Sequence, residues 1–409
     1  MCKIFERLPS NNEKPRVIIV ENGSGLGGSV ISLRKTAEIL LQAGWQTRLL
    51  VMHGDANVAE YLKSGGLDVV STWGYRRPDK VKGLLVNLNI KLVKWLVLLP
   101  VIVVEHLLYL YPITYFVWQL IRWRPDLVVF NNQYDGTLWL VTRLTGIGCR
   151  VVFHARGFFA FSWLNPQPKR WPLIVANSCS VKDCLLSLGW AGDRVKVVYN
   201  PFDFAAKFEH ITPVTDEPWA TDNMLRVAIL GNLEPWKGHE LFLKAAQIVS
   251  NGRSNVKFFI VGGETLSVSG RTEELKEIAR SLAIDNHIVF LGHRLDVYRV
   301  AKTMDVVVHA SITPEPFGNV IVEAMLLGRA VVAAGEGGPT EIITHETDGL
   351  LVPPRDPVAL AESLERLLAD DELRWRLGRN AITSAYQRFS YAKYGSEILN
   401  AYKTALLEG

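Results

Sequence analysis

Two glutamates, Glu315 and Glu323, have the types and placement needed to hold a polar ligand. The apolar run Val306–His309 predicts a strand, and Glu315 follows it in a loop between two prolines. Glu323 lies in the apolar run Val320–Leu327, which predicts a helix closed by Gly328. The spacing E-x7-E also occurs elsewhere in the chain, so spacing alone does not indicate a site. The interpretation depends on the strand, loop and helix around the pair. We expect both carboxylates to reach one crevice.

The start of the same helix is a candidate anion site. The first amides of a helix have no intrahelical carbonyl partner, and the helix dipole favours negative charge there. The residues at this position are Gly318, Asn319 and Val320. This predicts binding of a diphosphate next to the two glutamates.

A lysine on a separate loop can supply positive charge. Lys237 is the next-to-last residue of the segment Gly231–Gly238, which follows the expected strand Arg226–Leu230 and precedes a helix. A cation at such a junction adds to the helix amides against a departing phosphate. A surface lysine before a helix is also commonplace, so this motif alone does not establish a phosphate site.

A glycine-rich loop follows the first expected strand and includes Gly27 and Gly28. Its G-x-G-x-x-G pattern is typical of dinucleotide folds, but the expected acidic residue does not end the second strand. We therefore expect the glycines to let the backbone approach phosphates of a donor. A tight turn without a ligand is the alternative.

His154 ends another apolar strand. The carboxyl end of a strand in a doubly wound sheet faces the ligand crevice. We expect His154 to point there, with a buried structural histidine as the alternative.

Short β-branched runs alternate with amphipathic helices throughout the chain, which predicts an α/β protein with parallel sheets covered by helices. We expect two doubly wound domains, because 409 residues exceed the usual size of a domain with one hydrophobic core. We expect an N-terminal domain at 1–205, a linker at 206–223, a C-terminal domain at 224–390 and a final helix at 391–409 that packs on the N-terminal domain. The expected strands are Arg16–Val20, Thr47–Val51, Leu67–Val70, Asp126–Phe130, Arg150–His154, Leu173–Ala176, Val195–Val198, Arg226–Leu230, Lys257–Val261, Ile288–Leu291, Val306–His309 and Ala330–Ala333.

The segment 81–123 is rich in apolar and aromatic residues. Its two uncharged runs, Trp95–Val104 and Leu107–Ile121, are each shorter than the roughly 20 residues that a spanning helix needs. Basic residues flank and interrupt it, which is typical of a helix lying in an anionic membrane interface. A pair of buried core helices is the alternative.

The composition excludes several classes of protein. A net charge of +4 is too small to indicate nucleic-acid binding. The four cysteines have no metal-ligand spacing and no need to form disulfides. The polar first residues are unlike a signal peptide, so we expect a cytoplasmic protein, peripheral on the inner face of the membrane.

Taken together, the motifs resemble the retaining glycosyltransferase family 4, whose fold is GT-B, two Rossmann-like domains facing a central cleft. The resemblance covers most of the chain. It rests on Gly27-Gly28, His154, the G-x-L-x-x-x-K-G segment at 231–238, Glu315-Pro316-Phe317-Gly318 with Glu323, Gly337-Gly338-Pro339-Thr340-Glu341, Asp348-Gly349-Leu350-Leu351-Val352 and Phe389-Ser390.

The resemblance implies a role for each matching residue. Glu315 would contact donor sugar hydroxyls, Glu323 the ribose, and His154 the sugar. Lys237 and the amides from Phe317 to Val320, including those of Gly318 and Asn319, would hold the diphosphate. Asn232 stands where the family usually has Arg, which removes one cation from the donor site; Arg156 is a possible substitute.

These roles predict transfer of a sugar, with retention, from a nucleotide diphosphate donor to a glycan or lipid-linked acceptor. No cofactor and no metal are expected, because cationic groups take the metal's place. A nucleotide-sugar epimerase and a catalytically weak nucleotide-sugar-binding protein are the alternatives.

Overall fold

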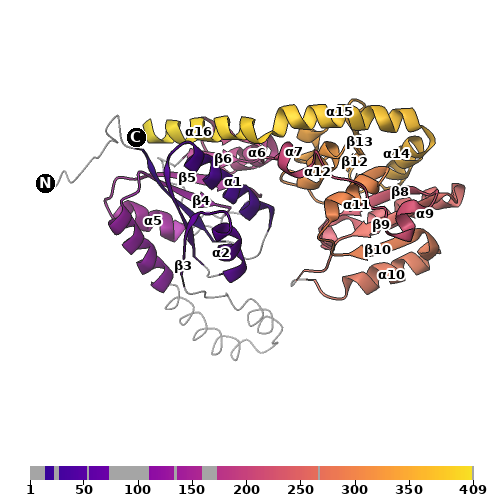
Figure 1. Cartoon of the computed structure of the whole chain (residues 1–409), viewed down its shortest axis with the longest axis horizontal. Coiled ribbons are helices and arrows are strands. Elements are labelled where there is room, and N and C mark those ends of the chain that lie inside the picture. The colour runs from indigo at the N-terminus through magenta and orange to yellow at the C-terminus, as the bar shows by residue number, and fades with distance from the viewer. Residues whose placement is uncertain are drawn as a thin grey trace. The chain divides into compact units, whose positions relative to one another are not determined.

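A computed structural model describes most of the chain, and the chain divides into two compact units (Figure 1). The described residues are 14–22, 27–52, 55–72, 110–132, 136–158, 173–265 and 268–407. The first unit contains Met1–Asn177, Val181–Val198 and Gly395–Gly409, and the second contains Ser178–Ser180 and Tyr199–Tyr394.

The first unit has a seven-stranded parallel sheet in the order β3-β2-β1-β4-β5-β6-β7. Apart from the first residues of β1 and β5, its central strands are buried, which agrees with their continuous apolar runs. The strands are β1 (Arg16–Glu21), β2 (Gln46–Val51), β3 (Asp68–Ser71), β4 (Leu127–Asn131), β5 (Arg150–Ala155), β6 (Leu173–Ala176) and β7 (Val195–Val197).

Apolar helix faces complete this core. Phe116 and Leu120, from a helix at 110–123, pack with Phe130 of β4 and with Leu138. The other helical elements of this unit are α1 (Gly28–Gln42), α2 (Ala56–Lys63), α5 (Gly136–Leu144) and η1 (Gly192–Arg194), together with α6 (Cys179–Ser187) from Val181 onward and α16 (Tyr391–Leu407) from Gly395 onward. Gly395 of α16 packs against Ile39 of α1.

The second unit has a six-stranded parallel sheet in the order β10-β9-β8-β11-β12-β13. Alternate residues of each strand enter different cores: Val227 joins one face, and Ala228 joins the other. The strands are β8 (Leu225–Leu230), β9 (Val256–Val261), β10 (Ile288–Gly292), β11 (Val306–His309), β12 (Ala330–Ala334) and β13 (Leu350–Val352).

Helices cover both faces of the second sheet. Phe242 of α9 and Leu364 of α14 pack on one face, while Val322 of α12 and Ala381 of α15 pack on the other. The helical elements are α7 (Phe204–Lys207), α8 (Pro218–Thr221), η2 (Pro235–Lys237), α9 (His239–Gly252), α10 (Arg271–Ser281), η3 (Asp285–His287), α11 (Val297–Thr303), α12 (Asn319–Leu326), α13 (Pro339–Ile342), α14 (Pro357–Ala369) and α15 (Asp371–Phe389).

The predicted α/β class with two parallel sheets is confirmed. Each predicted strand is present with its ends within about one residue of the prediction, because continuous β-branched runs mark buried parallel strands clearly. The sequence analysis did not predict β13, which has only 3 residues. The facing of the two domains across a cleft stays a prediction.

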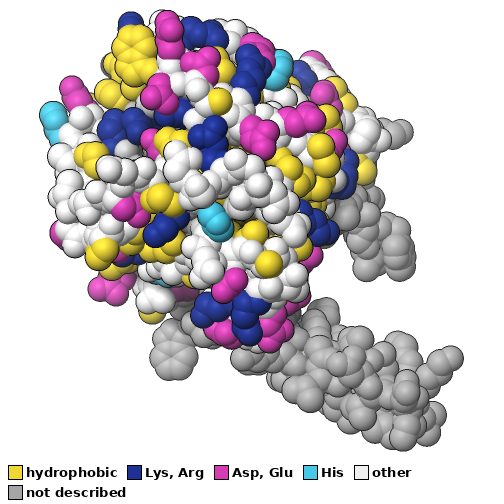
Figure 2. Space-filling view, turned by 90° about the vertical axis from the view of Figure 1, so that its right-hand side faces the viewer, with side chains coloured by type: hydrophobic (Ala, Val, Ile, Leu, Met, Phe, Trp, Pro, Cys, Tyr) yellow, Lys and Arg dark blue, Asp and Glu magenta, His cyan; other side chains and the backbone are white. Residues whose placement is uncertain are grey.

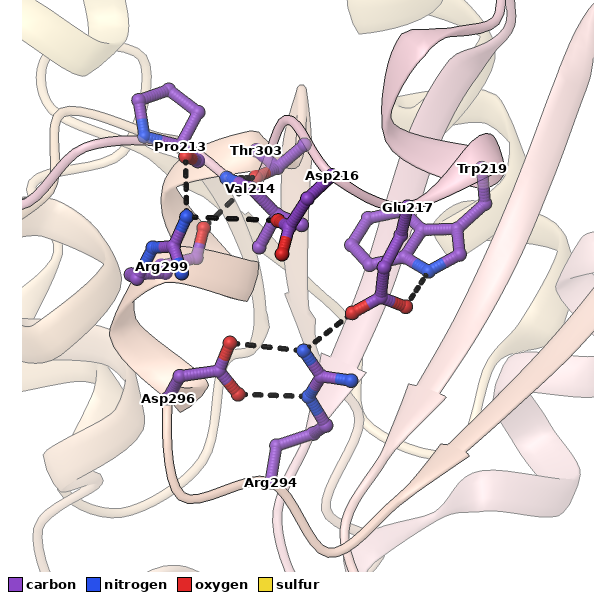
Figure 3. Close-up of polar contacts among 9 residues, drawn as sticks. All are labelled: Pro213, Val214, Asp216, Glu217, Trp219, Arg294, Asp296, Arg299 and Thr303. Atoms are coloured by element: carbon purple, nitrogen blue, oxygen red, sulfur yellow. Dashed lines mark hydrogen bonds and ion pairs between the residues drawn. The ribbon is translucent and has the colours of Figure 1, made fainter.

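The segment predicted as a linker, 206–223, belongs to the second unit, whose main part runs from Tyr199 to Tyr394. Figure 3 shows Arg294 bound to Asp296 at 2.8 Å and 2.9 Å and to Glu217 at 2.6 Å. The backbone N–H of Val214 donates to the hydroxyl of Thr303, 2.8 Å away. These contacts tie residues 213–219 to α11 and to the loop before it.

Charges of both signs alternate with apolar side chains on the face shown in Figure 2, with no broad field of either sign. In the apolar segment predicted at 81–123, positions 81–109 lie outside the described residues. Across the part of the chain that is described, no helix has the length and apolar content to cross a bilayer.

Candidate functional site

The centre of the candidate site is an ion pair between two loops of the second unit. Lys237 Nζ lies 2.9 Å from each carboxylate oxygen of Glu315. The Lys237 side chain is 20% exposed and that of Glu315 is 12% exposed, so the pair is partly shielded but open to a ligand. The structure thus brings together the two residues that the sequence assigned to the sugar and the diphosphate.

Two residues that the sequence analysis missed complete this cluster. His309 Nε2 lies 3.1 Å from Glu315 Oε2, and the hydroxyl of Ser311 donates to the same oxygen at 3.0 Å. His309 is the last residue of β11, so its position at the carboxyl end of a central strand was the available signal. The cluster is defined as Lys237, His309, Ser311 and Glu315.

These contacts determine the charge of Glu315. Burial by itself raises the pKa of a carboxyl group. The hydrogen bond from His309 and the positive charge of Lys237 outweigh burial and lower the pKa of Glu315 to about 2. Glu315 is therefore a carboxylate at neutral pH, ready to accept hydrogen bonds from hydroxyl groups.

The tautomer of His309 follows from the same geometry. The carboxylate is an acceptor, so Nε2 of His309 carries the proton that it donates. Nδ1 is buried and has no hydrogen-bond partner among the described residues. His309 thus donates to Glu315 Oε2, the oxygen that Lys237 also contacts.

Backbone contacts hold the lysine loop against the glutamate loop. The N–H of Ile312 donates to the carbonyl of Trp236 at 2.9 Å. Gly238 has φ of +77°, and a Cβ there would lie 1.8 Å from the carbonyl oxygen of Ala310. Only glycine permits this close approach, which places Lys237 within reach of Glu315. The lysine amine also lies 4.0 Å from the centre of the Trp236 ring.

A second glycine, Gly338, packs against the glutamate loop. The N–H of Gly338 donates to the carbonyl of Glu315 at 2.8 Å. A Cβ on Gly338 would lie 2.2 Å from the carbonyl oxygen of Phe317. The loop at 337–338 therefore packs flat against residues 315–317 and fixes the entry into α12.

The helix α12 begins directly after the loop that carries Glu315. Gly318 is its N-cap with φ of +108°, and no side chain caps the first turn. Phe317 is 2% exposed, and its ring packs against the rings of Tyr199 and Phe389, so its side chain belongs to the core. Val320 packs against the core, whereas the Asn319 side-chain oxygen accepts a hydrogen bond from Asn200 at 2.9 Å.

Glu323 lies one turn into α12 and is half-buried. It accepts a hydrogen bond from the Tyr298 hydroxyl at 3.2 Å. Asn232 is exposed on the loop after β8, five residues before Lys237. The structure places both residues in the same unit as the cluster.

The first unit holds the remaining predicted residues. Gly27 is the N-cap of α1, and its carbonyl accepts from Val30 and Ile31; Gly28 is the first residue of the helix. His154 is 2% exposed. Its Nδ1 lies 2.9 Å from an Arg156 nitrogen and its Nε2 lies 2.7 Å from the Tyr402 hydroxyl.

Both ring nitrogens of His154 are therefore engaged by protein groups. Burial, and then the charge of Arg156, lower the pKa of His154 well below its ordinary value, so the ring is neutral. This arrangement favours the structural alternative for His154. Contact with a sugar stays a prediction.

The described residues contain no group of three or more His, Cys, Asp or Glu side chains arranged to hold a metal ion.

Comparison with known proteins gives a match in the second unit. Residues 218–384 match the family Glycosyl transferases group 1. An uncharacterized glycosyltransferase of Methanocaldococcus jannaschii is 30% identical over 259 residues, which are 62% of this chain and 64% of that protein. A D-inositol 3-phosphate glycosyltransferase of Corynebacterium efficiens is 33% identical over 230 residues, 52% of this chain and 51% of that protein. The chain thus spans between half and two thirds of the length of these relatives.

Solved structures match the fold along nearly the whole chain. Anabaena Alr3699/HepE in complex with UDP has a TM-score of 0.76 at 22% identity and covers 95% of this chain and 100% of its own. The sucrose-phosphate synthase of Thermosynechococcus elongatus has a TM-score of 0.72 at 18% identity, covering 97% and 100%. The two Rossmann-like sheets are those of the GT-B fold.

Proposed function

We propose that this protein is a retaining glycosyltransferase that moves a sugar from a nucleotide diphosphate donor to an acceptor. The observation that carries the proposal is the Lys237–Glu315 pair beside the first turn of α12, within the segment that matches Glycosyl transferases group 1. A cation, a carboxylate and open helix amides are the groups that a diphosphate joined to a sugar requires.

In the proposed mechanism Lys237 acts on the leaving group. Bond cleavage at the anomeric carbon leaves negative charge on the terminal phosphate of the nucleotide. Lys237 and the α12 amides stabilise this charge more strongly than that of the intact donor, which lowers the barrier. The ammonium then exchanges part of its interaction with Glu315 for the phosphate.

Glu315 orients the sugar in this proposal. His309 and Ser311 keep the carboxylate in place when the lysine turns toward phosphate, because both bind the same oxygen, Oε2. The second oxygen, Oε1, then accepts hydrogen bonds from sugar hydroxyls. Glu323 is proposed to bind the ribose of the nucleotide, one turn further along α12.

Retention requires that the acceptor oxygen approach the face that the diphosphate leaves. We propose that the acceptor hydroxyl forms the new bond to the anomeric carbon as the phosphate oxygen departs, and that its proton passes to that phosphate oxygen. The cations of the protein take the place of a divalent metal. Turnover in EDTA equal to turnover with added manganese is expected, and a requirement for manganese would overturn this part.

UDP sugars are the first donors to test. Anabaena Alr3699/HepE, a protein of the same fold, has been solved with UDP and with UDP-glucose. We propose a uridine nucleotide on this likeness of fold, and the nucleotide is tested against alternatives in the experiment below.

The acceptor is proposed to be a lipid-linked or cell-surface glycan precursor, met at the inner face of the membrane. The helix at 110–123 supports this, because Leu110, Tyr111, Trp118 and Ile121 on it are 48–57% exposed. Arg122 lies over the Trp118 ring at 5.6 Å. Exposed aromatic and aliphatic side chains beside arginines suit an anionic lipid interface.

The test has two stages. Thermal shift with UDP, GDP, ADP and CMP sugars identifies the donor, and a radiolabelled form of that donor is then incubated with membrane lipid extract. Radioactive glycan product supports a transferase. Conversion of the donor to its epimer without any acceptor would support the epimerase alternative instead, and donor binding without either product would leave a binding protein.

A further inference from the structure

A hydrogen bond joins α12 to the preceding helix, α11, within the second unit. The hydroxyl of Tyr298, near the start of α11, donates to Glu323 Oε1 at 3.2 Å. Both side chains belong to half-buried residues. Glu323 is the residue proposed to bind the ribose of the donor, so a contact that holds its carboxylate bears on nucleotide binding.

A second bond joins the same two helices one turn further along. Lys302 lies one turn after Tyr298 on α11, and its amine donates to the carbonyl of Leu327 at 2.9 Å. Leu327 lies one turn after Glu323 and is the C-cap of α12. Residues four apart share one face of a helix, so the two bonds run along one line of contact. They fix α11 and α12 relative to each other at the position of Glu323.

The ring of Tyr298 is packed, which fixes the origin of its hydroxyl. Its centre lies 4.9 Å from the centre of the Phe208 ring. Phe208 is 3% exposed and is the C-cap of α7, and Tyr298 packs against the apolar cluster that contains it. A ring packed in this way has few rotamers open to it.

The helix that carries Tyr298 is itself held at both ends by the segment 213–219. Figure 3 shows Asp296, the N-cap of α11, bound to Arg294, which also binds Glu217. At the last residue of the helix, the Thr303 hydroxyl accepts from the N–H of Val214 at 2.8 Å. The hydroxyl that reaches Glu323 therefore comes from a fastened element.

A fixed donor beside a glutamate favours ligand binding. A glutamate side chain has several rotatable bonds, and ordering them when a ligand binds costs free energy. A hydrogen bond already present in the free protein reduces this cost. A carboxylate oxygen has two lone pairs, so accepting from Tyr298 does not prevent Glu323 from accepting from a ligand as well.

We infer that Tyr298 is a positioning residue that holds the Glu323 carboxylate in the orientation that accepts hydrogen bonds from the ribose hydroxyls of the nucleotide. The inference rests on the proposed function, which assigns the ribose to Glu323. It adds that the preference for ribose over deoxyribose depends on a tyrosine that acts through Glu323 rather than on the nucleotide.

The first test is the binding of UDP, 2′-deoxy-UDP and 3′-deoxy-UDP to the full-length protein by calorimetry. UDP is replaced by GDP, ADP or CMP if the thermal-shift screen of donors selects that nucleotide. Tyr298→Phe is compared with Tyr386→Phe, the matched control. Tyr386 packs against Phe204, at the other end of α7, with ring centres 5.7 Å apart. Each variant thus keeps its ring and loses only a hydroxyl.

The wild type is expected to bind UDP more tightly than at least one of the deoxy forms. Tyr298→Phe should reduce this preference by about three- to tenfold, the usual effect of one hydrogen bond. Tyr386→Phe should keep the preference of the wild type. A merely structural role of Tyr298 would change thermal stability and leave the preference intact. That result, a wild type without any preference, or a protein that binds none of the nucleotides would overturn the inference.

A double-mutant cycle shows whether Tyr298 acts through Glu323. Glu323→Ala should abolish the preference for ribose, and Tyr298→Phe added to Glu323→Ala should change nucleotide affinity no further. If Tyr298→Phe weakens UDP binding equally with and without Glu323, the tyrosine does not act by positioning this carboxylate, and the inference fails.

These binding measurements separate the inference from the proposed function. A ribose preference that Tyr298→Phe reduces supports the inference even if no sugar is transferred. Sugar transfer by a protein whose ribose preference is the same in Tyr298→Phe and in the wild type would overturn the inference and leave the proposed function standing.

Discussion

Lys237 and Glu315 are 78 residues apart in the chain, and the lysine amine lies 2.9 Å from both oxygens of the carboxylate. Neither loop sets this geometry alone. The Ile312–Trp236 backbone hydrogen bond and the packing of Gly238 against Ala310 bring the two loops together. The ion pair is thus a consequence of how β8 and β11, neighbours in the sheet, end side by side.

The loop contact at Gly238 can be tested by comparing two glycines with nearly the same backbone. Gly238 and Gly270 have φ of +77° and +79° and each precedes a helix, but a Cβ at Gly270 meets nothing within 4 Å. Gly270→Ala should lower the free energy of unfolding by about 1 kcal/mol, from backbone strain alone. Gly238→Ala should cost clearly more and abolish donor binding, because the Ala310 carbonyl must move. The free energy of unfolding of both variants is measured by denaturant unfolding. An equal loss in Gly238→Ala and Gly270→Ala would contradict the proposed role of this contact.

Acid stability reports the environment of Glu315. Its pKa is about 2 in the folded protein against 4.5 for the free group, so the folded state favours the carboxylate. This contribution is complete above about pH 4.5 and is lost as the pH falls toward 2.

Glu315→Gln should therefore flatten the decline of the free energy of unfolding over this window, by an amount on the order of 3 kcal/mol. Glu362→Gln, at an exposed position of α14, is the control and should leave the slope unchanged. Urea unfolding at a series of pH values measures both. A slope in Glu315→Gln equal to that of the wild type would show that the carboxylate is not stabilised as described.

His309 should act through Glu315 rather than on the substrate directly. His309→Phe removes the hydrogen bond to Oε2 and is expected to raise the pKa of Glu315 toward its ordinary value, because burial then has less to oppose it. The acid limb of the pH profile of kcat/KM should move to higher pH. A profile that keeps its acid limb while only the melting temperature drops would assign His309 a packing role.

Asn232 offers a gain-of-function test. It is exposed on the loop after β8, where the resembling family usually has Arg. Asn232→Arg should raise kcat by up to about tenfold if a further cation stabilises the departing phosphate. Asn232→Gln, which adds length without charge, is the control. An Asn232→Arg variant no faster than Asn232→Gln would show that this position lies outside the charge-stabilising groups.

Attachment to a membrane surface can be tested with two similar tryptophans of the chain. Trp118 and Trp375 are both exposed, by 50% and 62%, and each has an arginine four residues later over its ring. Trp118→Ser should reduce sedimentation with anionic liposomes several-fold, because an aromatic anchor of the interface is lost. Trp375→Ser should leave it unchanged. Equal partitioning of both variants would argue against the helix at 110–123 as the contact surface.

The sequence was sufficient to predict the sheets but not the polar clusters. Runs such as Val306–His309 identify buried parallel strands without further information, because their periodicity is local. The 3-residue strand β13 is too short for such a signal. The expectation that Lys237 and Glu315 share a ligand came from their loops, while the direct ion pair between them depends on strand order.

Other contacts have a weak local signature or none. The one signal for His309 is its place at the carboxyl end of a strand, and a core histidine at a strand end has the same signal. Tyr402 lies 248 residues from His154, and only the return of α16 to the first unit brings the hydroxyl to the ring. His154 was expected at the ligand crevice because of its place in the strand, and its neighbours across the sheet determine how its nitrogens are used.

The most direct test of the proposed function is transfer and donor binding by Lys237→Ala, measured beside Lys244→Ala. Lys244 is an exposed lysine of α9, seven residues from Lys237, so its removal changes the net charge equally. Lys237→Ala is predicted to lower kcat about 100- to 1,000-fold, the usual loss when one charge-stabilising group is removed. Lys244→Ala should match the wild type. Turnover by Lys237→Ala equal to that of Lys244→Ala would contradict the assignment of the donor diphosphate to this site.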